Sequence, residues 1–323
     1  MYVAGIVFAS FAAAALIGYL VNSARSRGEL DDIRPYGQLV EVDGRRMHVH
    51  TLGSGGQAIV LLPGFGVALP SADFGPLMRA LSQEHVVATV EYFGIGFSDQ
   101  TDVPRTNANY VHELRAALAA AGLKPPYILM PHSASGIYCE YYASTFPEEV
   151  AALVMLDTTS TAKIDGGNPP SFLFQIAKAQ QAIGLIRLAS KLAPETKLAA
   201  NGYTAKEVAD YWLFNLHVVN DTLINQASLL MENIKQVNQL PFPAQIPVLK
   251  LISTQSIAGM AKRDRDDGMG YQRAHLARLG ENAQHQTIDA THFIYQTKAE
   301  QIADLTRTFL ARLSVVALND KPI

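Results

Sequence analysis

The stretch YILMPHSASGIYCEYYASTF, residues 127–146, passes within a few positions from an apolar run to a helical pattern. The run YILMP is typical of a buried parallel strand, and the pattern that begins at Ser135 is typical of a helix. Ser133 lies between them, where a sharp turn exposes a nucleophilic side chain. Such a turn needs small residues two positions before and after the serine, and Pro131 and Ser135 stand there. We expect the turn to form, because a proline at the last strand position loses little and serine is only modestly larger than glycine.

Other apolar runs extend this pattern along the chain. They are AIVLLP (58–63), VVATVEY (86–92), ALVMLD (152–157) and PVLKLI (247–252). Helical patterns such as ANYVHELRAALAAAG lie between several of them. The runs QLVEV and RMHVHTL flank Asp43-Gly44 and predict an antiparallel hairpin near the start of the domain. Alternating strands and helices predict an α/β fold with a mostly parallel sheet, whose ligands bind beyond the carboxyl ends of the strands.

The interval 159–243 interrupts the alternation with helical stretches alone. These stretches are FLFQIAKAQQAIGLIRLASKL, AKEVADYWLFNL and TLINQASLLMENIKQ. We expect residues 36–158 and 244–318 to form the α/β core, and residues 159–243 to form a helical cap over the carboxyl edge of the strands.

The composition is that of a globular protein with a substantial core, at 49% apolar and 17% charged residues in a chain of 323. A formal net charge of −3 provides no basic field, so nucleic acid is not expected as a partner. Cys139 is the sole cysteine, which excludes an internal disulfide and leaves the compartment open. The oligomeric state stays open as well.

The N-terminal segment differs from the rest, because residues 2–21 carry no charged side chain. About twenty apolar residues suffice to cross a bilayer, so we expect residues 1–24 to form a single-pass membrane anchor. A cleaved signal peptide and a buried helix are the alternatives, although a signal peptide has a positive start and a shorter apolar run. Arg25, Arg27 and Arg34 follow the segment and favour a cytoplasmic catalytic domain.

Further residues join Ser133 in the order typical of a catalytic triad in this kind of sheet. TIDATHFIYQ places His292 on a loop between a short β-type run and a final amphipathic helix, where a general base can reach the sheet edge. LLPGFG places Phe65 on the turn after an earlier strand, and its backbone N–H can join that of Ala134 in an oxyanion hole.

LLPGFG, YFGIGFSD, PPYILMPHSASG, FPEEVAALVMLD and ATHFIYQ together resemble the α/β-hydrolase fold, in its ester-hydrolase type, over about residues 38–315. The sequence departs from that pattern at Pro63, where the family has histidine, and at Pro131 and Ser135. A larger departure follows PVLKLI, because the family usually carries the triad acid shortly after this strand. The sequence reads Ser253, Thr254, Gln255 and Ser256 at that place.

The resemblance implies Asp157 as the acid, since some family members, including a group of haloalkane dehalogenases, carry it at the end of the preceding strand. Asp157 in VMLDTT can instead cap the following turn. Other candidate acids are Asp264, Asp266 and Asp267 in the charged run KRDRDDG, and Asp289 near His292. His48 and His50 share a strand face, but no third metal ligand is evident.

The resemblance thus implies a serine hydrolase that cleaves an ester of a small or apolar acyl substrate, as carboxylesterases and lipases do, without cofactor or metal. Amide, thioester, lactone or carbon–carbon bond hydrolysis can use the same triad. An inert hydrolase shell that binds a ligand is the remaining alternative. An aspartate nucleophile, as in epoxide hydrolases and dehalogenases, is disfavoured because position 133 is serine.

Overall fold

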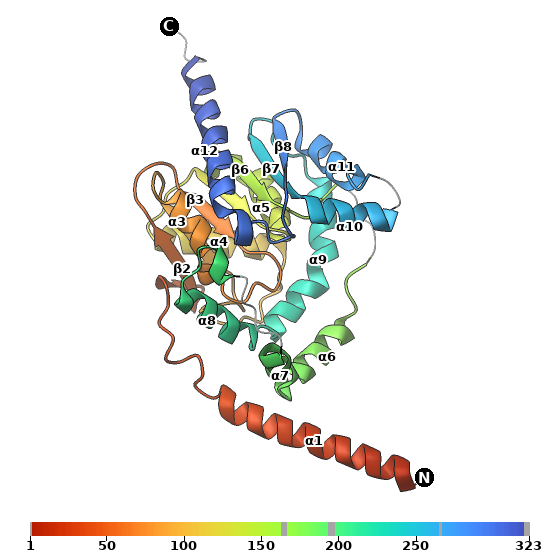
Figure 1. Ribbon diagram of the computed structural model, residues 1–323. Helices are drawn as coiled ribbons and strands as arrows, with labels where there is room; N and C mark the ends of the chain where they lie inside the picture. The colour runs from red at the N-terminus through yellow and green to blue at the C-terminus, as the bar shows by residue number, and fades with distance from the viewer. Residues whose placement is uncertain (1, 163–166, 193–197, 265–266, 320–323) are drawn as a thin grey trace.

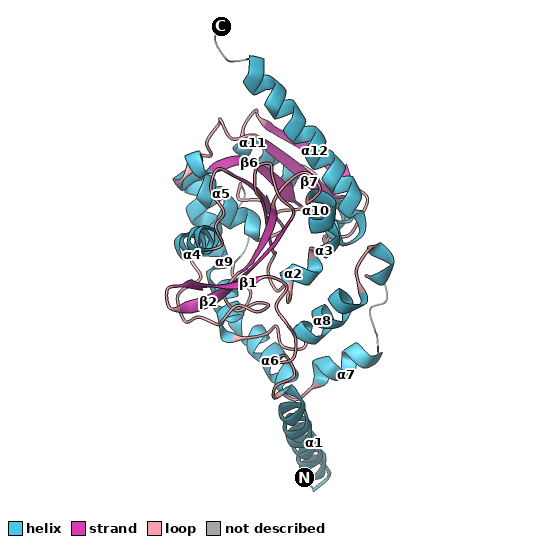
Figure 2. Cartoon of the chain, turned by 90° about the vertical axis from the view of Figure 1, so that its left-hand side faces the viewer, coloured by secondary structure: helices cyan, strands magenta, loops and turns pink. Residues whose placement is uncertain are grey.

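A computed structural model describes residues 2–162, 167–192, 198–264 and 267–319 of the chain. Within them, eight strands form one sheet in the order β1-β2-β4-β3-β5-β6-β7-β8 (Figures 1 and 2). The strands are β1 Gln38–Val42, β2 Arg45–Leu52, β3 Ile59–Leu62, β4 Val87–Glu91, β5 Tyr127–Pro131, β6 Val150–Leu156, β7 Val248–Ser253 and β8 Ala283–Ile288. β2 is antiparallel to β1 and β4, and all other neighbours are parallel. The expected hairpin and mostly parallel sheet are confirmed.

The interior strands coincide with the apolar runs because both faces of the sheet are covered. Every residue of β3, β4, β5 and β7 is buried. β8 differs, since four of its six residues are exposed. It is an edge strand with β7 on one side alone, and it therefore needs no apolar run.

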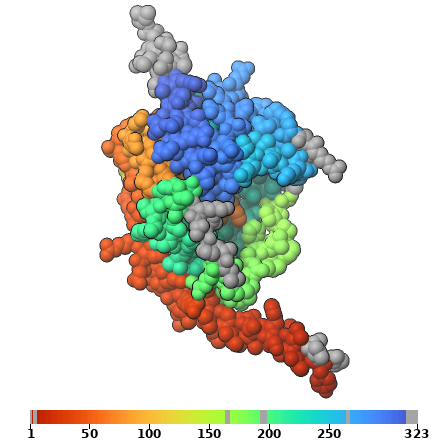
Figure 3. All heavy atoms as spheres, viewed as in Figure 1, coloured from red at the N-terminus to blue at the C-terminus, as the bar shows by residue number. Residues whose placement is uncertain are grey.

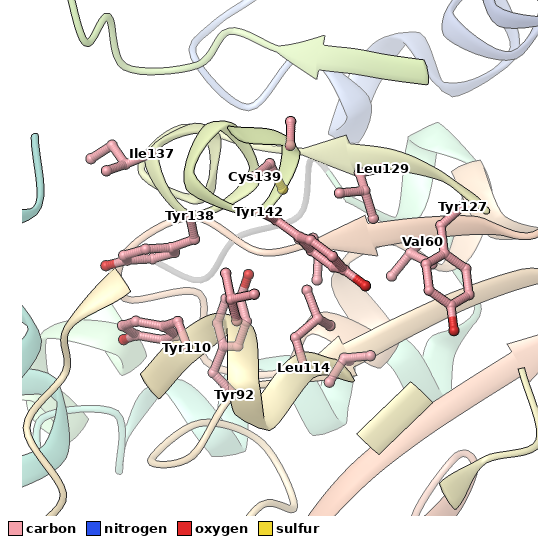
Figure 4. Packing of buried hydrophobic residues seen from close by; sticks show 14 of the residues in the cluster. Val60, Tyr92, Tyr110, Leu114, Tyr127, Leu129, Ile137, Tyr138, Cys139 and Tyr142 are labelled. Atoms are coloured by element: carbon pink, nitrogen blue, oxygen red, sulfur yellow. The ribbon is translucent and has the colours of Figure 1, made fainter. Parts of the chain in front are cut away.

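Helices cover the two faces of the sheet with separate apolar clusters. α3 Gly75–Leu81 and α12 Tyr295–Asn319 pack on one face, and α4 Asn107–Ala120 and α5 Ser135–Thr145 pack on the other. In the second cluster, Tyr110 of α4 stacks on Tyr138 of α5 with ring centroids 3.9 Å apart (Figure 4). α5 is thereby held between α4 and the strands, which fixes the turn that precedes it.

Four α-helices occupy the chain between β6 and β7 in the described residues. They are α6 Ser171–Ala182, α7 Leu185–Leu192, α8 Ala205–Asn215 and α9 Asp221–Gln239. The stretch 172–192 reads as one helical pattern in the sequence, but the structure divides it at Gly184. This residue has φ +78°, a left-handed conformation that ends a helix and that glycine adopts without strain.

Shorter elements complete the described chain. They are α2 Pro70–Asp73, η1 Pro147–Glu149, η2 Ala199–Asn201, α10 Thr254–Asp264 and α11 Gly270–Leu279.

The N-terminal helix α1, Tyr2–Ser26, extends away from the body of the molecule (Figures 1 and 3). It is long and apolar enough from Ile6 to Ser26 to cross a membrane, and none of that apolar stretch is buried against the rest of the protein. Its C-terminal end contacts α6.

Candidate active site

Ser133 lies on the turn between β5 and α5 and has φ +52°, in the left-handed region that side chains other than glycine rarely adopt. Three backbone hydrogen bonds hold this conformation. The Ser133 N–H donates to Leu156 O at 3.2 Å, and the N–H groups of Gly136 and Thr159 donate to Ser133 O at 3.1 Å. The bonds to Leu156 and Thr159 tie the turn to the end of β6, so the neighbouring strand stabilises the strained residue.

The two unusual residues of the turn fit without breaking it. Pro131 ends β5, in register with Leu62 of β3. The Ser135 hydroxyl donates to the Pro63 carbonyl and lies 3.2 Å from the Tyr92 hydroxyl. The closest approach falls one position later, because a Cβ added to Gly136 would lie 2.7 Å from Thr158 Cβ. The position that must be glycine is therefore 136, one residue after Ser135.

His292 lies on the loop after β8 and joins two residues from other strands. Its Nε2 is 2.9 Å from Ser133 Oγ, and its Nδ1 is 2.7 Å from Asp157 Oδ2. Because a carboxylate only accepts hydrogen bonds, Nδ1 carries the proton and Nε2 accepts from the serine hydroxyl. The His292 side chain is 42% exposed and that of Asp157 is 2% exposed, so one end of the line opens to solvent while the acid is buried.

Asp157 follows β6 and has φ +43°, a second strained residue at the same edge of the sheet. Its carboxylate accepts two further hydrogen bonds, from the Ser253 N–H at 2.9 Å and from the Ser256 hydroxyl at 2.6 Å. The Ser253 hydroxyl in turn donates to Ala290 O at 2.7 Å, two residues before His292. Ser253 and Ser256 stand where the family pattern leads one to expect the acid, and they hold the carboxylate of Asp157, which follows β6.

The other candidate acids lie elsewhere or outside the described residues. Asp267 is exposed and pairs with Arg273 at 2.7 Å. Asp289 accepts a hydrogen bond from Thr254 at 3.2 Å on the surface. The side chain of Asp264 and the whole of Asp266 lie outside the described residues.

The residues expected to form an oxyanion hole flank Ser133. Ala134 is the N-cap of α5, and neither its N–H nor that of Phe65 has an acceptor among the described residues. A Cβ added to Gly64 would lie 2.8 Å from Ser133 Cβ, which shows how closely this turn approaches the serine. The Phe65 ring packs against Phe174 of α6, with centroids 5.8 Å apart, so α6 reaches the edge of the site.

His132 is buried next to Ser133 in the chain, and its ring centroid lies 4.7 Å from that of His292. Burial, together with the nearby His292, lowers the pKa of His132 to about 3, so the ring is neutral. A ring N–H donates from Nε2 to the His292 carbonyl at 3.2 Å, and the ring packs against Phe293 and Tyr295. His132 thus holds the loop that carries His292.

His48 and His50 do not assemble a metal site with their surroundings. His48 lies 3.2 Å from the buried Glu91 carboxylate and accepts a hydrogen bond from the Gly37 N–H. Within the described part of the chain, no three histidine, cysteine or acidic side chains lie close enough to hold a metal ion.

A serine, a histidine and a buried carboxylate are joined in that order at the carboxyl edge of a mostly parallel sheet, and the chain has the α/β-hydrolase fold. The family model described as alpha/beta hydrolase fold matches residues 57–199.

Similarity to individual proteins extends further along the chain. The uncharacterized protein YbdG of Bacillus subtilis is 26% identical over 330 residues, which cover 95% of this chain and 97% of that protein. A pimeloyl-[acyl-carrier protein] methyl ester esterase of Xylella fastidiosa is 31% identical over 113 residues, 35% of this chain and 40% of the esterase. An enol-lactonase of Burkholderia xenovorans has a similar structure, with TM-score 0.59, 15% identity and coverage of 85% of this chain and 100% of the lactonase. An epoxide hydrolase of Vigna radiata has TM-score 0.63, 18% identity and coverage of 85% and 97%. At these identities the two structures establish a shared fold, and the named relatives support a hydrolase.

Proposed function

We propose that this protein is a serine hydrolase that cleaves a carboxylic ester through an acyl-enzyme. The observation that carries the proposal is the hydrogen-bonded line from Ser133 through His292 to the buried Asp157. A neutral histidine within 2.9 Å of a serine hydroxyl can take its proton, and the carboxylate stabilises the imidazolium that results.

The steps follow from the geometry. His292 Nε2 accepts the Ser133 proton while Oγ attacks the carbonyl carbon, and the N–H groups of Phe65 and Ala134 stabilise the tetrahedral oxyanion. His292 then donates the proton to the leaving alcohol, which leaves the acyl group on Ser133. A water molecule, activated by His292, attacks the acyl-enzyme and releases the acid. The residues of the chain suffice for both half-reactions.

The serine also separates this site from epoxide chemistry, although an epoxide hydrolase shares the fold. Attack of a serine oxygen on an epoxide carbon forms an ether, which water does not cleave by addition to a carbonyl. Attack on an ester forms a second ester, which the same site can hydrolyse. A lactone is a cyclic ester and follows the same steps, so a lactone is the second candidate substrate, favoured by the similarity to an enol-lactonase.

The N-terminal helix supports a location at a membrane. α1 is exposed along its apolar length, and Arg25 and Arg27 near its C-terminal end are exposed. We infer a single-pass anchor at residues 1–24 with the hydrolase core on the cytoplasmic side, because basic residues flank the span on that side. Residues 159–243 then form the cap between the anchor and the core.

Labelling with a fluorophosphonate probe tests the proposed nucleophile directly. We expect covalent modification of the full-length protein at Ser133 and loss of labelling in Ser133→Ala. Hydrolysis of p-nitrophenyl esters should fall at least about 10⁴-fold in Ser133→Ala and in His292→Ala, because triad members act as one unit. Ser54→Ala, on an exposed loop, serves as the matched control and should keep both labelling and turnover. Substantial hydrolysis by folded Ser133→Ala would refute the proposal.

A further inference from the structure

The exposed large apolar side chains of this protein are concentrated in three helices. Among the described residues outside α1, they are Leu39, Phe172, Leu173, Ile176, Leu185 and Leu188. All of these except Leu39 belong to α6 and α7 of the cap. Scattered apolar side chains are normal on a protein surface, but a cluster confined to two consecutive helices marks an interaction surface.

The two faces of α6 have different surroundings. Phe172, Leu173 and Ile176 lie on one side of the helix and are exposed. Phe174 is half-buried on the other side, where its ring contacts Phe65 at the edge of the active site. The outer face is therefore not the underside of the cap, and packing over Ser133 does not explain its apolar character.

The outer surface of α6 and α7 continues the surface of the N-terminal helix. A Cβ added to Gly18 of α1 would lie 2.6 Å from the carbonyl oxygen of Ile183, in the turn between α6 and α7. The Asn22 side chain donates to the carbonyls of Gln181 and Ala182 at 3.0 and 3.2 Å. Figure 3 shows the cap segment near residue 180 lying directly against the C-terminal part of α1.

An ion pair reinforces this junction at the polar end of α1. Nη1 and Nη2 of Arg187 in α7 each donate to one oxygen of the Glu29 carboxylate at 2.6 Å. His217 lies 3.0 Å from the same carboxylate. The hydrogen bond from Arg187 holds the pKa of Glu29 below its usual range, outside the apolar span. The position of α6 and α7 relative to α1 is thus fixed by polar as well as close backbone contacts.

The contact with Gly18 sets the depth of the cap relative to a membrane. The apolar run of residues 2–21 spans about 30 Å as a helix, which matches the hydrocarbon core. Gly18 lies three residues before the end of that run, or about 4.5 Å below the surface at 1.5 Å per residue. The turn between α6 and α7 therefore lies at the boundary between headgroups and hydrocarbon when α1 spans the bilayer.

The charge of the two cap helices suits a lipid surface. Residues 171–192 contain Lys178, Arg187 and Lys191 and no acidic residue. Arg187 is paired with Glu29 and Lys178 with Asp221 at 2.6 Å, so the exposed Lys191 is the basic residue best placed to meet an anionic headgroup. Amphipathic helices with apolar residues on one face and basic residues beside them bind in the interface of anionic bilayers.

We propose that the outer face of α6 and α7 docks into the lipid bilayer beside α1, and that the ester is an amphiphile drawn from that bilayer. The first part concerns the surface alone, and the second rests on the proposed function. In this arrangement Leu173 and Ile176 of α6 contact the bilayer. Phe174 of the same helix contacts Phe65, whose backbone N–H belongs to the proposed oxyanion hole. An acyl chain that leaves the membrane next to α6 therefore meets an apolar helix before it meets Ser133.

Site-specific fluorescence tests the docking without reference to catalysis. Cys139 is buried and is the sole cysteine, so a thiol-reactive NBD dye labels an introduced cysteine. Leu173→Cys and Leu188→Cys are compared with Leu39→Cys, an exposed apolar position on β1. In vesicles of phosphatidylcholine with anionic phosphatidylglycerol, we expect blue-shifted emission and quenching by doxyl-labelled lipids at positions 173 and 188, and neither at 39. Water-like emission at all three positions would overturn the proposal.

A second experiment tests the substrate class. The full-length variant Leu173→Gln/Ile176→Gln/Leu185→Gln/Leu188→Gln is compared with Leu39→Gln in the same vesicles. We expect the rate on a long-chain ester in the bilayer, divided by the rate on soluble p-nitrophenyl acetate, to fall at least tenfold in the quadruple variant and to stay unchanged in Leu39→Gln. An unchanged ratio in the quadruple variant would overturn the substrate class. Absence of fluorophosphonate labelling at Ser133 would refute the proposed function while the fluorescence result stands on its own.

Discussion

A line of acid, histidine and serine and a line of acid, histidine and lysine lie in the described part of this protein, and they differ in exposure and in the backbone that carries them. In the first, Asp157, His292 and Ser133 lie on turns at the carboxyl edge of the sheet. Two of these residues have positive φ, and the histidine is partly exposed. This line combines strain with access from solvent, which is typical of a functional site.

The second line, Glu140, His275 and Lys250, is fully buried. Glu140 accepts a hydrogen bond from His275 at 2.8 Å, and the Lys250 ammonium contacts the other ring nitrogen. Burial lowers the pKa of Lys250 to about 7 and also lowers that of His275. Burial alone would raise the pKa of Glu140, but His275, Thr161 and Arg278 more than offset it and keep the carboxylate charged.

The comparison teaches that the order of groups does not define a catalytic site. Glu140 lies within α5, Lys250 within β7 and His275 within α11, all on regular backbone. No substrate reaches groups with no exposed surface, so we expect the second line to act in stability, where it joins α5, the helix after Ser133, to β7 and α11. A charged line inside a core is costly unless each member is paired.

Removing the charge of each acid should separate the two lines most sharply. Asp157→Asn should lower ester turnover by about 10⁴-fold with little change in melting temperature, because the amide favours the wrong histidine tautomer. Glu140→Gln should keep turnover within a few-fold and lower the free energy of unfolding by about 3 kcal/mol. The substitution removes a buried carboxylate that is paired with Arg278 and accepts a hydrogen bond from His275. Steady-state kinetics and urea unfolding measure both.

The alternative acids provide the control for this pair. Replacement of Asp264, Asp266 and Asp267 together by asparagine should leave turnover nearly unchanged. If this triple variant loses activity while Asp157→Asn keeps it, the acid lies on the later loop. If Glu140→Gln abolishes turnover in folded protein, the second line takes part in catalysis and the contrast fails.

Much of this contrast was predictable from the sequence, and the part that was not depends on contacts between distant segments. The strands β3 to β7 follow from continuous apolar runs, and the turn at Ser133 from the small residues around it. The structure brings Ser133, Asp157 and His292 together as expected, while their catalytic roles stay predictions. Ser253 and Ser256 reach Asp157 across 96 and 99 residues, because β6 and β7 are neighbours in the sheet. That adjacency is a property of the fold and has no local signature.

One residue of the buried line is unusual in the sequence. It is Lys250, the lysine inside the apolar run PVLKLI. A lysine in a strand that is buried on both faces needs a partner. The partner, His275, comes from α11, where the sequence gives no strong pattern, and Glu140 comes from a helix 110 residues before Lys250. The lysine therefore indicated that a partner exists but not which residue it is.

The protonation of Lys250 should make stability depend on pH. Its pKa is about 7 in the folded protein and about 10.4 when unfolded. The unfolded chain therefore binds more protons between these values, so stability rises with pH across this window and the penalty is complete below about pH 7. The unfolding free energy of the wild type minus that of Lys250→Met should rise between pH 7 and 9, by at most about 1.4 kcal/mol per pH unit. A flat difference would mean that Lys250 keeps its charge across the window.

Loss of the hydrogen bond from Ser256 to Asp157 should lower turnover less than loss of the Asp157 carboxylate. Ser256→Ala removes a hydroxyl that donates to Asp157 at 2.6 Å and leaves the bond from Ser253 in place. A hydrogen bond to a charged group contributes about 1.5 to 3 kcal/mol, so turnover should fall roughly tenfold to a hundredfold. Ser256→Thr, which keeps the hydroxyl, is the matched control and should recover most of the rate. Equal losses in both variants would indicate that packing, not the hydrogen bond, is responsible.

The smallest expected effect is the difference in unfolding free energy between a glycine and an alanine variant at the same position. This difference should have opposite signs at Ser133 and at Glu140. At Ser133, φ is +52°, so a glycine relieves strain that an alanine keeps. Ser133→Gly should therefore be more stable than Ser133→Ala by about 1 kcal/mol, although both are inactive. At Glu140, inside α5, a glycine costs about 1 kcal/mol relative to alanine, so Glu140→Gly should be the less stable of its pair. Urea unfolding of the four variants measures both differences. If the glycine variant is not the more stable at position 133, Ser133 is not held in a strained conformation, and strain would no longer distinguish the first line from the second.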